Sequence, residues 1–311
     1  MRSGISESHL TTPPGARRPR RLRRIAAAVD ARPGGQDAAA LGAALAGAGG
    51  AELVLASVEP DLLRVLPGCD ATLMHRETLA MLSETQRRSA ASARTWADHD
   101  RSVAHGLQRM VRAERRDLLV VGSSARARAG EVAIGRLTRG LLHDLPCPVA
   151  IAPSGLADRS PLALREIAVG YDGGLEAQRA LALAAGLALA SGARLSVCGV
   201  VDDRIPSLGW PQLWPGAMAD AWQETMAEEE AVLRERIQTA LEPLALDASA
   251  EVLRGRPAAA LLRRSRGADL LVIGSRRWGA PARVILGGTG EGLAHGARCA
   301  LLVVPRATGR I

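Results

Sequence analysis

The chain contains no lysine, no asparagine and no phenylalanine, and it has a single tyrosine. The absence of lysine excludes a phosphate-binding loop of the Gly-x4-Gly-Lys-Ser/Thr type, because that loop uses its lysine to reach the phosphates. Gly130 and Gly135 have the required spacing, but Arg136 and Leu137 follow, so the match is fortuitous. With aromatic residues at 2% and hydrophobic residues at 47%, leucine, valine, isoleucine and alanine must fill the core.

Cysteine is also scarce, and long apolar runs are absent. The four cysteines are widely spaced and form no Cys-x-x-Cys pair, which is typical of a reducing cytoplasm. Cys147, Cys198 and Cys299 lie in strand-like contexts, where we expect small buried core residues. No run reaches the roughly eighteen apolar residues of a membrane span. The arginine-rich N-terminus is followed only by an apolar segment of strand length, so we predict no secretory signal and a cytoplasmic location.

Positive charge is concentrated at the N-terminus. Residues 1–24 contain seven arginines against one glutamate, which is +6 of the +8 carried by the whole chain. The remainder is close to neutral, so nucleic acid is not expected as a partner except through this tail. Residues 1–23 are polar and aperiodic, and we predict a disordered arginine-rich tail. It can be an electrostatic arm for nucleic acid or an anionic membrane surface, or a solvated tail without a partner.

One stretch of the sequence occurs twice. Asp117 and Asp269, 152 residues apart, each open a run that begins Asp-Leu-Leu-Val, continues through a glycine-containing loop and ends in a short apolar segment before proline. A repeat of this kind indicates two copies of one domain. We predict copy one over residues 24–153 and copy two over residues 165–306, joined by a linker over 154–164.

In both copies, short apolar runs alternate with helical segments. The first runs, 25–29 and 167–171, are each followed by an aspartate, Asp30 or Asp172. Alternating strands and helices predict a parallel sheet with right-handed crossovers and helices on both faces. The predicted fold class is therefore α/β, with two tandem copies of a five-stranded, Rossmann-like parallel sheet.

The two copies are predicted to differ in their third strand. Copy two has a strand-like run at 248–253, whereas copy one has a helix predicted over about 71–97 and then only residues 100–103, so its third strand is shortened or missing. The last runs, 148–152 and 301–304, are apolar on both faces and lie at a sheet edge in this topology. Covering that edge favours an intramolecular pseudo-dimer of the two copies, and it leaves room for a homodimer.

A glycine-containing loop leads into a helix start in each copy, where backbone N–H groups can bind an anion. Asp30 and Asp172 end strands at the edge where ligands of α/β proteins lie, although a turn or helix-capping role fits them equally. The strand-one aspartate, the Asp-Leu-Leu-Val-Ile/Val-Gly-Ser strand and the glycine thirteen positions later occur in order in both copies. Together they resemble the universal stress protein family in its tandem form, over residues 24–153 and 165–305.

The resemblance implies an adenine-nucleotide alpha-hydrolase-like fold. ATP-binding members carry Gly-x2-Gly-x9-Gly-Ser/Thr, whose glycines let the backbone approach the phosphates, so ATP is the expected cofactor. The cofactor-binding residues that the resemblance implies are Asp172, Gly173, Gly174, Val200, Gly274, Arg277, Gly287, Gly288 and Gly290 in copy two, and Asp30, Gly122, Gly135, Arg136 and Thr138 in copy one.

Both loops depart from the family pattern. In copy two, Arg277 replaces the second glycine and Gly288 replaces the hydroxyl residue. In copy one, Ala125 and Arg136 stand at those positions. The arginines can bind phosphate, fill the pocket or point to solvent. We favour copy two as the site, because it keeps a glycine turn after strand one, three loop glycines and a full third strand.

Two functions stay open at this point. One is a regulatory module of a stress response that binds an adenine nucleotide, ATP. The other is a nucleotide-free scaffold of the same fold whose loops have degenerated. An enzyme is not predicted, because the sequence offers no identifiable base, carboxylate pair for a metal, or lysine.

Overall fold

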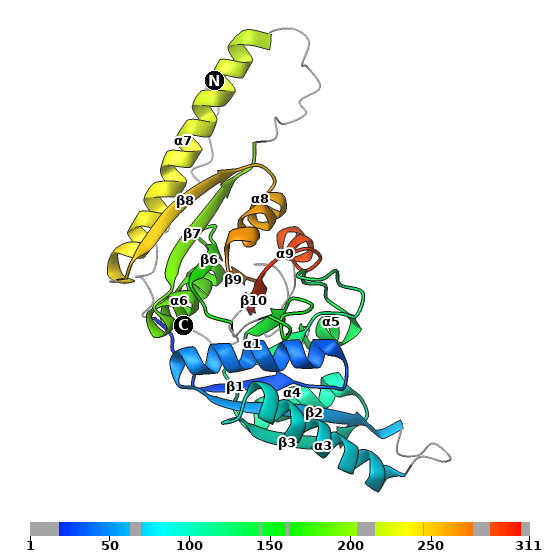
Figure 1. Ribbon diagram of the computed structural model, residues 1–311. Coiled ribbons are helices and arrows are strands. Elements are labelled where there is room, and N and C mark those ends of the chain that lie inside the picture. The colour runs from blue at the N-terminus through cyan, green and yellow to red at the C-terminus, as the bar shows by residue number, and fades with distance from the viewer. Residues whose placement is uncertain are drawn as a thin grey trace.

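The computed structural model describes residues 19–62, 70–142, 145–159, 162–203, 215–244, 246–275 and 287–305. Within them the chain forms one continuous ten-stranded sheet in the order β3-β2-β1-β4-β5-β10-β9-β6-β7-β8 (Figure 1). Each copy contributes one half of it. The strands are β1 (Arg24–Ala28), β2 (Glu52–Pro60), β3 (Arg94–Asp100), β4 (Leu118–Gly122), β5 (Val149–Ala152), β6 (Glu166–Gly170), β7 (Arg194–Val201), β8 (Ala248–Arg254), β9 (Leu270–Gly274) and β10 (Ala300–Val304).

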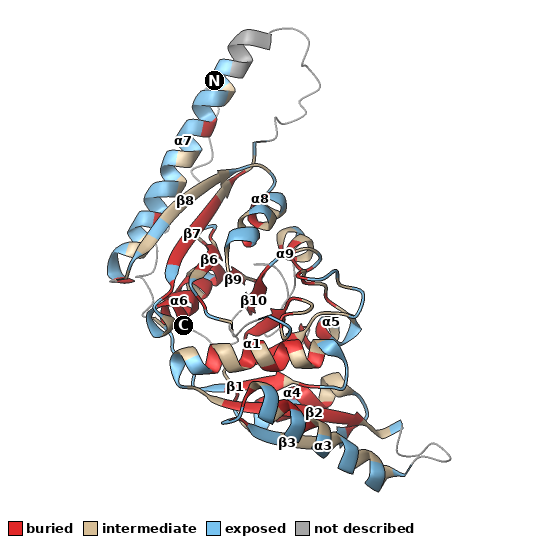
Figure 2. Cartoon of the chain, in the orientation of Figure 1, coloured by how far each residue is buried: buried red, intermediate tan, exposed pale blue. Residues whose placement is uncertain are grey.

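Helices cover both faces of this sheet, as the predicted α/β class requires. One buried cluster of leucine, valine and alanine side chains lies beneath α1, α3, α6 and α7, and a second lies beneath α4, α5, α8 and α9. Figure 2 shows the buried central strands and the exposed outer faces of α3 and α7. The helices are α1 (Pro33–Gly49), α3 (Ala71–Ser89), α4 (Val103–Ala113), α5 (Arg136–Leu142), α6 (Leu175–Ser191), α7 (Pro215–Leu241), α8 (Pro257–Arg264) and α9 (Gly288–Leu293).

The alanine-rich helices α1 and α6 are equivalent in the two copies and stop in the same way. Each is followed by a glycine in the left-handed conformation, Gly50 at φ 65° and Gly192 at φ 68°. Glycine adopts this conformation without the steric cost that a Cβ imposes, so both helices end where the sequence supplies it. Among the described helices, none is both long enough and apolar enough to cross a lipid bilayer.

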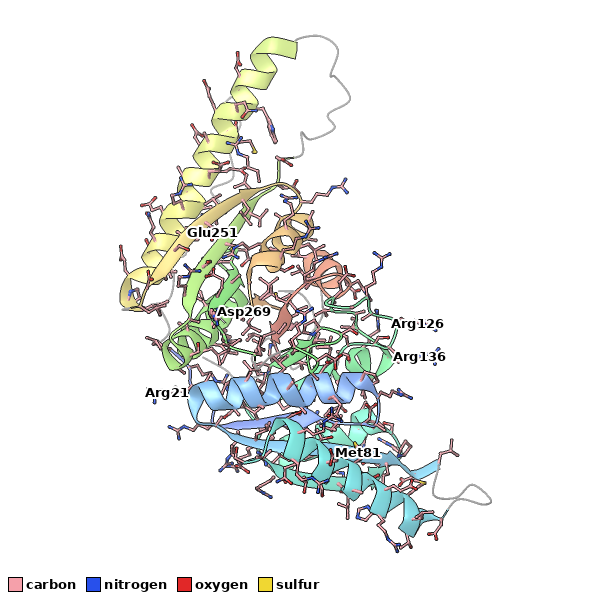
Figure 3. All side chains as sticks on the ribbon, viewed as in Figure 1. Arg21, Met81, Arg126, Arg136, Glu251 and Asp269 are labelled. Atoms are coloured by element: carbon pink, nitrogen blue, oxygen red, sulfur yellow. The ribbon has the colours of Figure 1, made fainter. Side chains whose placement is uncertain are left out.

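The aspartates that open the repeated stretch fix the start of the first strand in each copy. Asp117 Oδ2 accepts hydrogen bonds from two consecutive backbone N–H groups at the start of β1, at 2.8 and 3.0 Å. Asp269, labelled in Figure 3, accepts the equivalent pair at the start of β6, at 2.8 and 2.9 Å. The repeat of this aspartate therefore has a structural cause, since each one ties its fourth strand to its first.

The two half-sheets join through their last strands. β5 and β10 pair antiparallel, with Ile151 opposite Leu301, Ala150 opposite Leu302 and Val149 opposite Val303. All the side chains of this seam are buried. The prediction that these apolar edges cover one another is thus confirmed within the chain. A homodimer would involve contacts between chains and stays a prediction.

A loop of copy one reinforces the seam. The backbone N–H groups of Val132 and Ile134 donate to the carbonyl oxygens of Ala297 (2.8 Å) and Ala294 (3.0 Å), which lie between α9 and β10. The Arg298 guanidinium also contacts a Glu131 carboxylate oxygen at 2.9 Å. The stretch that the sequence suggested as a phosphate loop in copy one is therefore bound to copy two by its backbone.

The prediction of a tail without structure up to residue 23 is wrong for its last residues. The Arg20 N–H donates to the carbonyl oxygen of Ala182 in α6 at 2.9 Å. A Cβ on Gly186 would lie 2.1 Å from the Arg20 carbonyl oxygen, so the segment crosses α6 in direct contact. Leu22 is buried in the core. One leucine among arginines gives no periodic signal, which is why the pattern missed it. Residues 1–18 lie outside the described residues.

The third strand of copy one was also mispredicted. β3 is a seven-residue strand that pairs with β2 from Val54 opposite Arg94 to Pro60 opposite Asp100. The preceding helix α3 ends at Ser89, well before the predicted residue 97. β3 is an edge strand and carries Arg, Thr, Asp and His side chains, so it lacks the apolar run that identifies a central strand.

The contact of the N-terminal segment with α6 predicts that it stabilises the fold. We expect Leu22→Ala to lower the free energy of unfolding by about 2–5 kcal/mol, the range for truncating a buried leucine. Leu189→Ala is the control, because Leu189 lies on α6 with 52% of its surface exposed. Urea unfolding of both variants gives the two values. Equal, small losses would show that the segment does not pack in solution.

Candidate functional site

Copy two contains a cavity of about 590 Å³ at the carboxyl ends of β6, β7 and β9. This is the edge of a parallel sheet where α/β proteins place their ligands. Helices α6, α8 and α9 form its sides. The residues that line it are Gly170, Tyr171, Asp172, Glu176, Ala177, Cys198, Val200, Pro257, Leu261, Ile273, Gly274, Ser275, Gly287, Gly288, Thr289 and Gly290.

Asp172 reaches the cavity through a turn that depends on glycine. Gly173 has φ +80°, a conformation that residues with a Cβ rarely adopt. The Asp172 Oδ1 accepts a hydrogen bond from the Gly174 N–H at 2.8 Å, which closes the turn before α6. The sequence left open a turn role and a ligand role for this aspartate. The turn role is realised, and the residue also lines the cavity. Gly173 and Gly174 shape this turn, but they are not among the residues that line the cavity.

Gly274 has a packing role that the glycine motif did not reveal. A Cβ at this position would lie 2.7 Å from the Glu176 carbonyl carbon and 2.8 Å from its Cβ. The equivalent glycine of copy one, Gly122, meets Gly34 of α1 in the same way, with 2.0 Å to its carbonyl oxygen. The strand must therefore end in glycine to let the first helix of its copy pass, whether or not a ligand binds.

Part of the cavity lining is apolar. Val200, Pro257, Leu261 and Ile273 line it. A surface of this kind suits one flat face of an aromatic base. Cys198 lies at the same wall but is fully buried, and burial raises the pKa of its thiol to about 12. At neutral pH it is thus a protonated core residue and not a nucleophile.

A polar group in the cavity has no partner among the described residues. Ser275 is 6% exposed and its Oγ makes no hydrogen bond there. In copy one the equivalent Ser123 Oγ donates to the Ala152 carbonyl oxygen at 2.7 Å and accepts from the Ala133 N–H at 3.2 Å. The same residue thus holds the loop in copy one, while in copy two its buried hydroxyl makes no such bond within the described residues. Buried hydroxyls are normally satisfied, so this one points to a missing partner.

The loop glycines of copy two leave space on the same side. Gly287, Gly288 and Gly290 line the cavity. A Cβ added to Gly288 would meet no atom within 4 Å, so this position faces open space. Arg277, proposed from the sequence as a phosphate ligand, lies outside the described residues. The structure therefore brings together Asp172, Val200, Gly274 and the three loop glycines of the predicted set.

In copy one the corresponding region contains two close approaches at glycine. A Cβ on Gly106 of α4 would lie 2.6 Å from Cγ1 of Val58, the residue equivalent to Val200. A Cβ on Gly35 would lie 2.4 Å from the Asp30 carbonyl oxygen. Position 31 is an alanine with no positive φ, so the turn after Asp30 differs from the one after Asp172. Close backbone approaches at glycine are thus found at this edge of copy one as well.

The other predicted site residues of copy one lie in a turn and at the start of α5. Asp30 Oδ1 accepts from the Arg32 N–H at 3.1 Å, a turn role. Thr138 lies on the buried face of α5 with 3% exposure, and Arg136 is exposed at the start of that helix (Figure 3). Gly135 precedes α5, where a Cβ would make an ordinary contact with Ser124 at 3.5 Å.

Sequence reasoning missed several residues of the cavity, above all Glu176 and Ser275. Glu176 is 8% exposed and lies in the first turn of α6. Glu176 lies in the cavity lining because α6 contacts Gly274. This contact joins residues almost one hundred positions apart, so it leaves no local pattern in the sequence. Ser275 could have been found, because it follows the strand glycine in both copies. Within the described residues, no group of His, Cys, Asp and Glu side chains is arranged to hold a metal ion.

A partly buried ion cluster holds α8, and with it one wall of the cavity, against the sheet. The Arg264 guanidinium binds the Glu166 carboxylate of β6, the Ser196 hydroxyl of β7 at 2.7 Å and the Glu251 carboxylate of β8 at 2.9 Å (Glu251 is labelled in Figure 3). The side chains of Arg264 and Glu166 are 16% and 14% exposed. Removing one member of such a cluster leaves a partly buried charge with fewer partners.

This cluster makes stability depend on pH. Burial raises the pKa of the Glu166 carboxyl, but hydrogen bonds from Ser196 and Arg264 and the charges of Arg264 and Arg194 outweigh it, so the pKa lies below the ordinary 4.5. A carboxyl whose pKa is lowered by folding stabilises the fold above its unfolded pKa, and this contribution is lost as the pH falls through the folded value. We expect the unfolding free energy to fall below pH 4.5, and to fall less in Glu166→Gln.

Urea titrations at a series of pH values below neutrality test this. Glu77→Gln is the matched control, because Glu77 is an exposed carboxylate of α3. It should follow the wild type. A Glu166→Gln profile parallel to that of the wild type over the acid range would show that this carboxyl does not contribute to the pH dependence.

Comparison with known proteins places these features in context. The sequence profile of the universal stress protein family matches residues 21–153 and 163–305. A universal stress protein of Mycobacterium tuberculosis (strain H37Rv) is 30% identical over 193 residues, which are 60% of this chain and 60% of that protein. The match thus spans about 60% of the length of that relative. A universal stress protein of Thermus aquaticus is 33% identical over 142 residues, 45% of this chain and 98% of that protein.

Solved structures give the same answer for the fold. A universal stress protein from Archaeoglobus fulgidus aligns with a TM-score of 0.65 at 20% identity, over 91% of this chain and 98% of that one. A functionally unknown protein from Pseudomonas aeruginosa aligns with a TM-score of 0.64 at 17% identity, over 92% and 93%. At these identities the likeness concerns the fold, including the tandem arrangement.

Proposed function

This chain belongs to the universal stress protein family in its tandem form, and from that premise we propose that its copy-two cavity binds an adenine nucleotide and that the bound state regulates a stress response in the cytoplasm. The observation that carries the proposal is the cavity itself, which Asp172, several apolar side chains, Ser275 and the loop glycines line. A family resemblance without this geometry would support the fold and not the ligand.

In this proposal the base lies against Val200, Leu261 and Ile273, where burial of its apolar faces drives binding. Asp172 accepts a hydrogen bond from the ribose or the base. Ser275 supplies a hydroxyl donor, and the loop glycines allow the ligand to approach the backbone. No residue is assigned a catalytic role, because the protein acts by changing its bound state. The buried, unpaired thiols of Cys147, Cys198 and Cys299 are in keeping with a reducing compartment.

Copy one has a different role in this proposal. Its ligand edge is packed by Gly106 against Val58, and its loop is bound to copy two by backbone hydrogen bonds. We assign to it the function of a structural partner that covers the edge of β10. The scaffold alternative, drawn from the degenerate loops, thus applies to this half of the chain.

The proposal predicts a difference between the two aspartates. Asp172→Ala should weaken binding of an adenine nucleotide by about 1.5–3 kcal/mol, because it removes a charged hydrogen-bond acceptor. Asp30→Ala is the matched control and should bind as the wild type does. Isothermal titration calorimetry on the full chain measures both. A larger loss for Asp30→Ala, or an unchanged affinity for Asp172→Ala, would contradict the assignment to copy two.

A second variant tests the cavity by filling it. Gly288→Val should abolish binding while the fold is retained, since a Cβ at this position meets no protein atom within 4 Å. Thermal unfolding checks that the variant is folded. The nucleotide released on denaturing the purified wild-type protein identifies what the site carries. Full binding by Gly288→Val would show that the ligand lies elsewhere.

A further inference from the structure

We propose that copy one positions helix α9 at the copy-two cavity, so that the affinity of the cavity for its ligand depends on the loop over residues 131–134 and on Arg139 of the other half of the chain. The inference rests on the proposed function, because it concerns the same cavity. It adds residues that act on the site without lining it, and it gives the tandem arrangement a role in binding.

Helix α9 joins the cavity to the seam between the copies. Gly288, Thr289 and Gly290 form its first turn and line the cavity. The helix ends at Leu293, and the chain continues to Ala300 at the start of β10, the strand that pairs with copy one. A displacement of α9 would therefore change the shape of the cavity directly.

The sequence of α9 makes a weak helix. Three of its six residues, Gly-Thr-Gly-Glu-Gly-Leu, are glycine. Glycine is the least favourable residue in a helix interior after proline, and isolated helices shorter than about twelve residues are marginal in water even with favourable residues. The equivalent helix of copy one, α5, contains one glycine in seven residues. Contacts with the rest of the protein must therefore hold α9 in place.

The loop of copy one that precedes α5 supplies some of these contacts. The Ile134 N–H donates to the carbonyl oxygen of Ala294, the residue that ends α9, at 3.0 Å. The Val132 N–H donates to the carbonyl oxygen of Ala297 at 2.8 Å. The side chains of Val132 and Ile134 are buried in the same hydrophobic cluster as Leu293 of α9. Copy one thus holds the end of α9 by its backbone and shares a core with it.

Two ion pairs accompany these hydrogen bonds. Arg139 of α5 contacts the Glu291 carboxylate of α9 at 3.6 Å, and Figure 1 shows the two helices as neighbours. Glu131 contacts the Arg298 guanidinium at 2.9 Å, and its side chain is only 18% exposed. Both ends of the segment from α9 to β10 are therefore tied to copy one.

Helix α8 also contacts α9. A Cβ on Gly292 would lie 2.8 Å from the Cβ of Ala258 in α8, so these two helices touch directly. The competing explanation is that α8 is sufficient to fix α9. Changes in the copy-one loop would then lower the stability of the fold and leave the affinity of the cavity as it is.

Two matched valine variants separate these explanations. Val132 and Val111 are both 1% exposed and belong to the same hydrophobic cluster, but Val111 lies on α4. Val132→Ala and Val111→Ala remove the same atoms, so we expect similar losses of stability in urea unfolding. Calorimetric titration of the full-length proteins with ATP should show an affinity loss of about fivefold for Val132→Ala, the lower end of typical coupling between sites. Val111→Ala should bind ATP as the wild type does.

A charge exchange tests the same contact without opening a space in the core. Arg298→Glu brings two carboxylates together and should weaken ATP binding, because like charges at this distance repel. Adding Glu131→Arg restores the ion pair in reverse and should restore the affinity. Arg76→Glu changes the net charge equally at an exposed position of α3 and should have no effect. A loss that the second change does not restore would show that the contact does not position the site.

Hydrogen exchange reports on α9 without a ligand. The α9 amides should exchange faster in Val132→Ala than in Val111→Ala, because local opening becomes easier when supporting contacts are lost. Equal exchange, or equal ATP affinity of the two valine variants, would overturn this inference and leave adenine binding intact. No ATP binding by the wild type would overturn the proposed function as well. If Val132→Ala does not fold, the charge exchange decides.

Discussion

The antiparallel pairing of β5 with β10 is the contact on which the rest of the structure depends. Each copy by itself would present an apolar last strand whose backbone groups lack partners on one side, and such an edge promotes association. Joining the two edges turns two five-stranded sheets into one and buries the seam completely. Helices α1 and α6 then share one hydrophobic cluster across the seam, so the halves are stabilised together. The loop of copy one that the sequence suggested as a phosphate loop also contacts copy two, through the backbone N–H groups of Val132 and Ile134.

The difference between the copies arises from a few backbone positions. Gly173 adopts a left-handed conformation after Asp172, whereas Ala31 does not, although both aspartates accept a hydrogen bond from the N–H two residues later. Gly106 lets α4 approach Val58 closely, while the equivalent Val200 remains at the wall of an open cavity. Ser123 is used within its own loop, while Ser275 has no described partner. Small residues therefore account for these local differences between the copies, although both have the same topology.

The sequence predicted those features that leave a repeating or periodic signal. The repeated Asp117 and Asp269, the apolar runs and the two-sided character of the last strands sufficed for the fold and for the seam. The full length of β3 was not predicted, because an edge strand can be polar. The burial of Leu22 was not predicted either, because a single apolar residue gives no periodic pattern. At the candidate site, Asp172 and the loop glycines could be found from spacing. Glu176 could not be found in this way. Its place in the cavity results from the contact between helix α6 and Gly274, which forms only in the folded chain.

The seam has a geometric consequence for the two halves. Because β10 runs antiparallel to β5, all strands of copy two point opposite to those of copy one within a single sheet. The carboxyl ends of the strands, where ligands bind in this class of fold, therefore lie on opposite rims. A molecule held at one rim cannot touch the other. A side chain added at the rim of copy one would therefore have no steric effect on the rim of copy two.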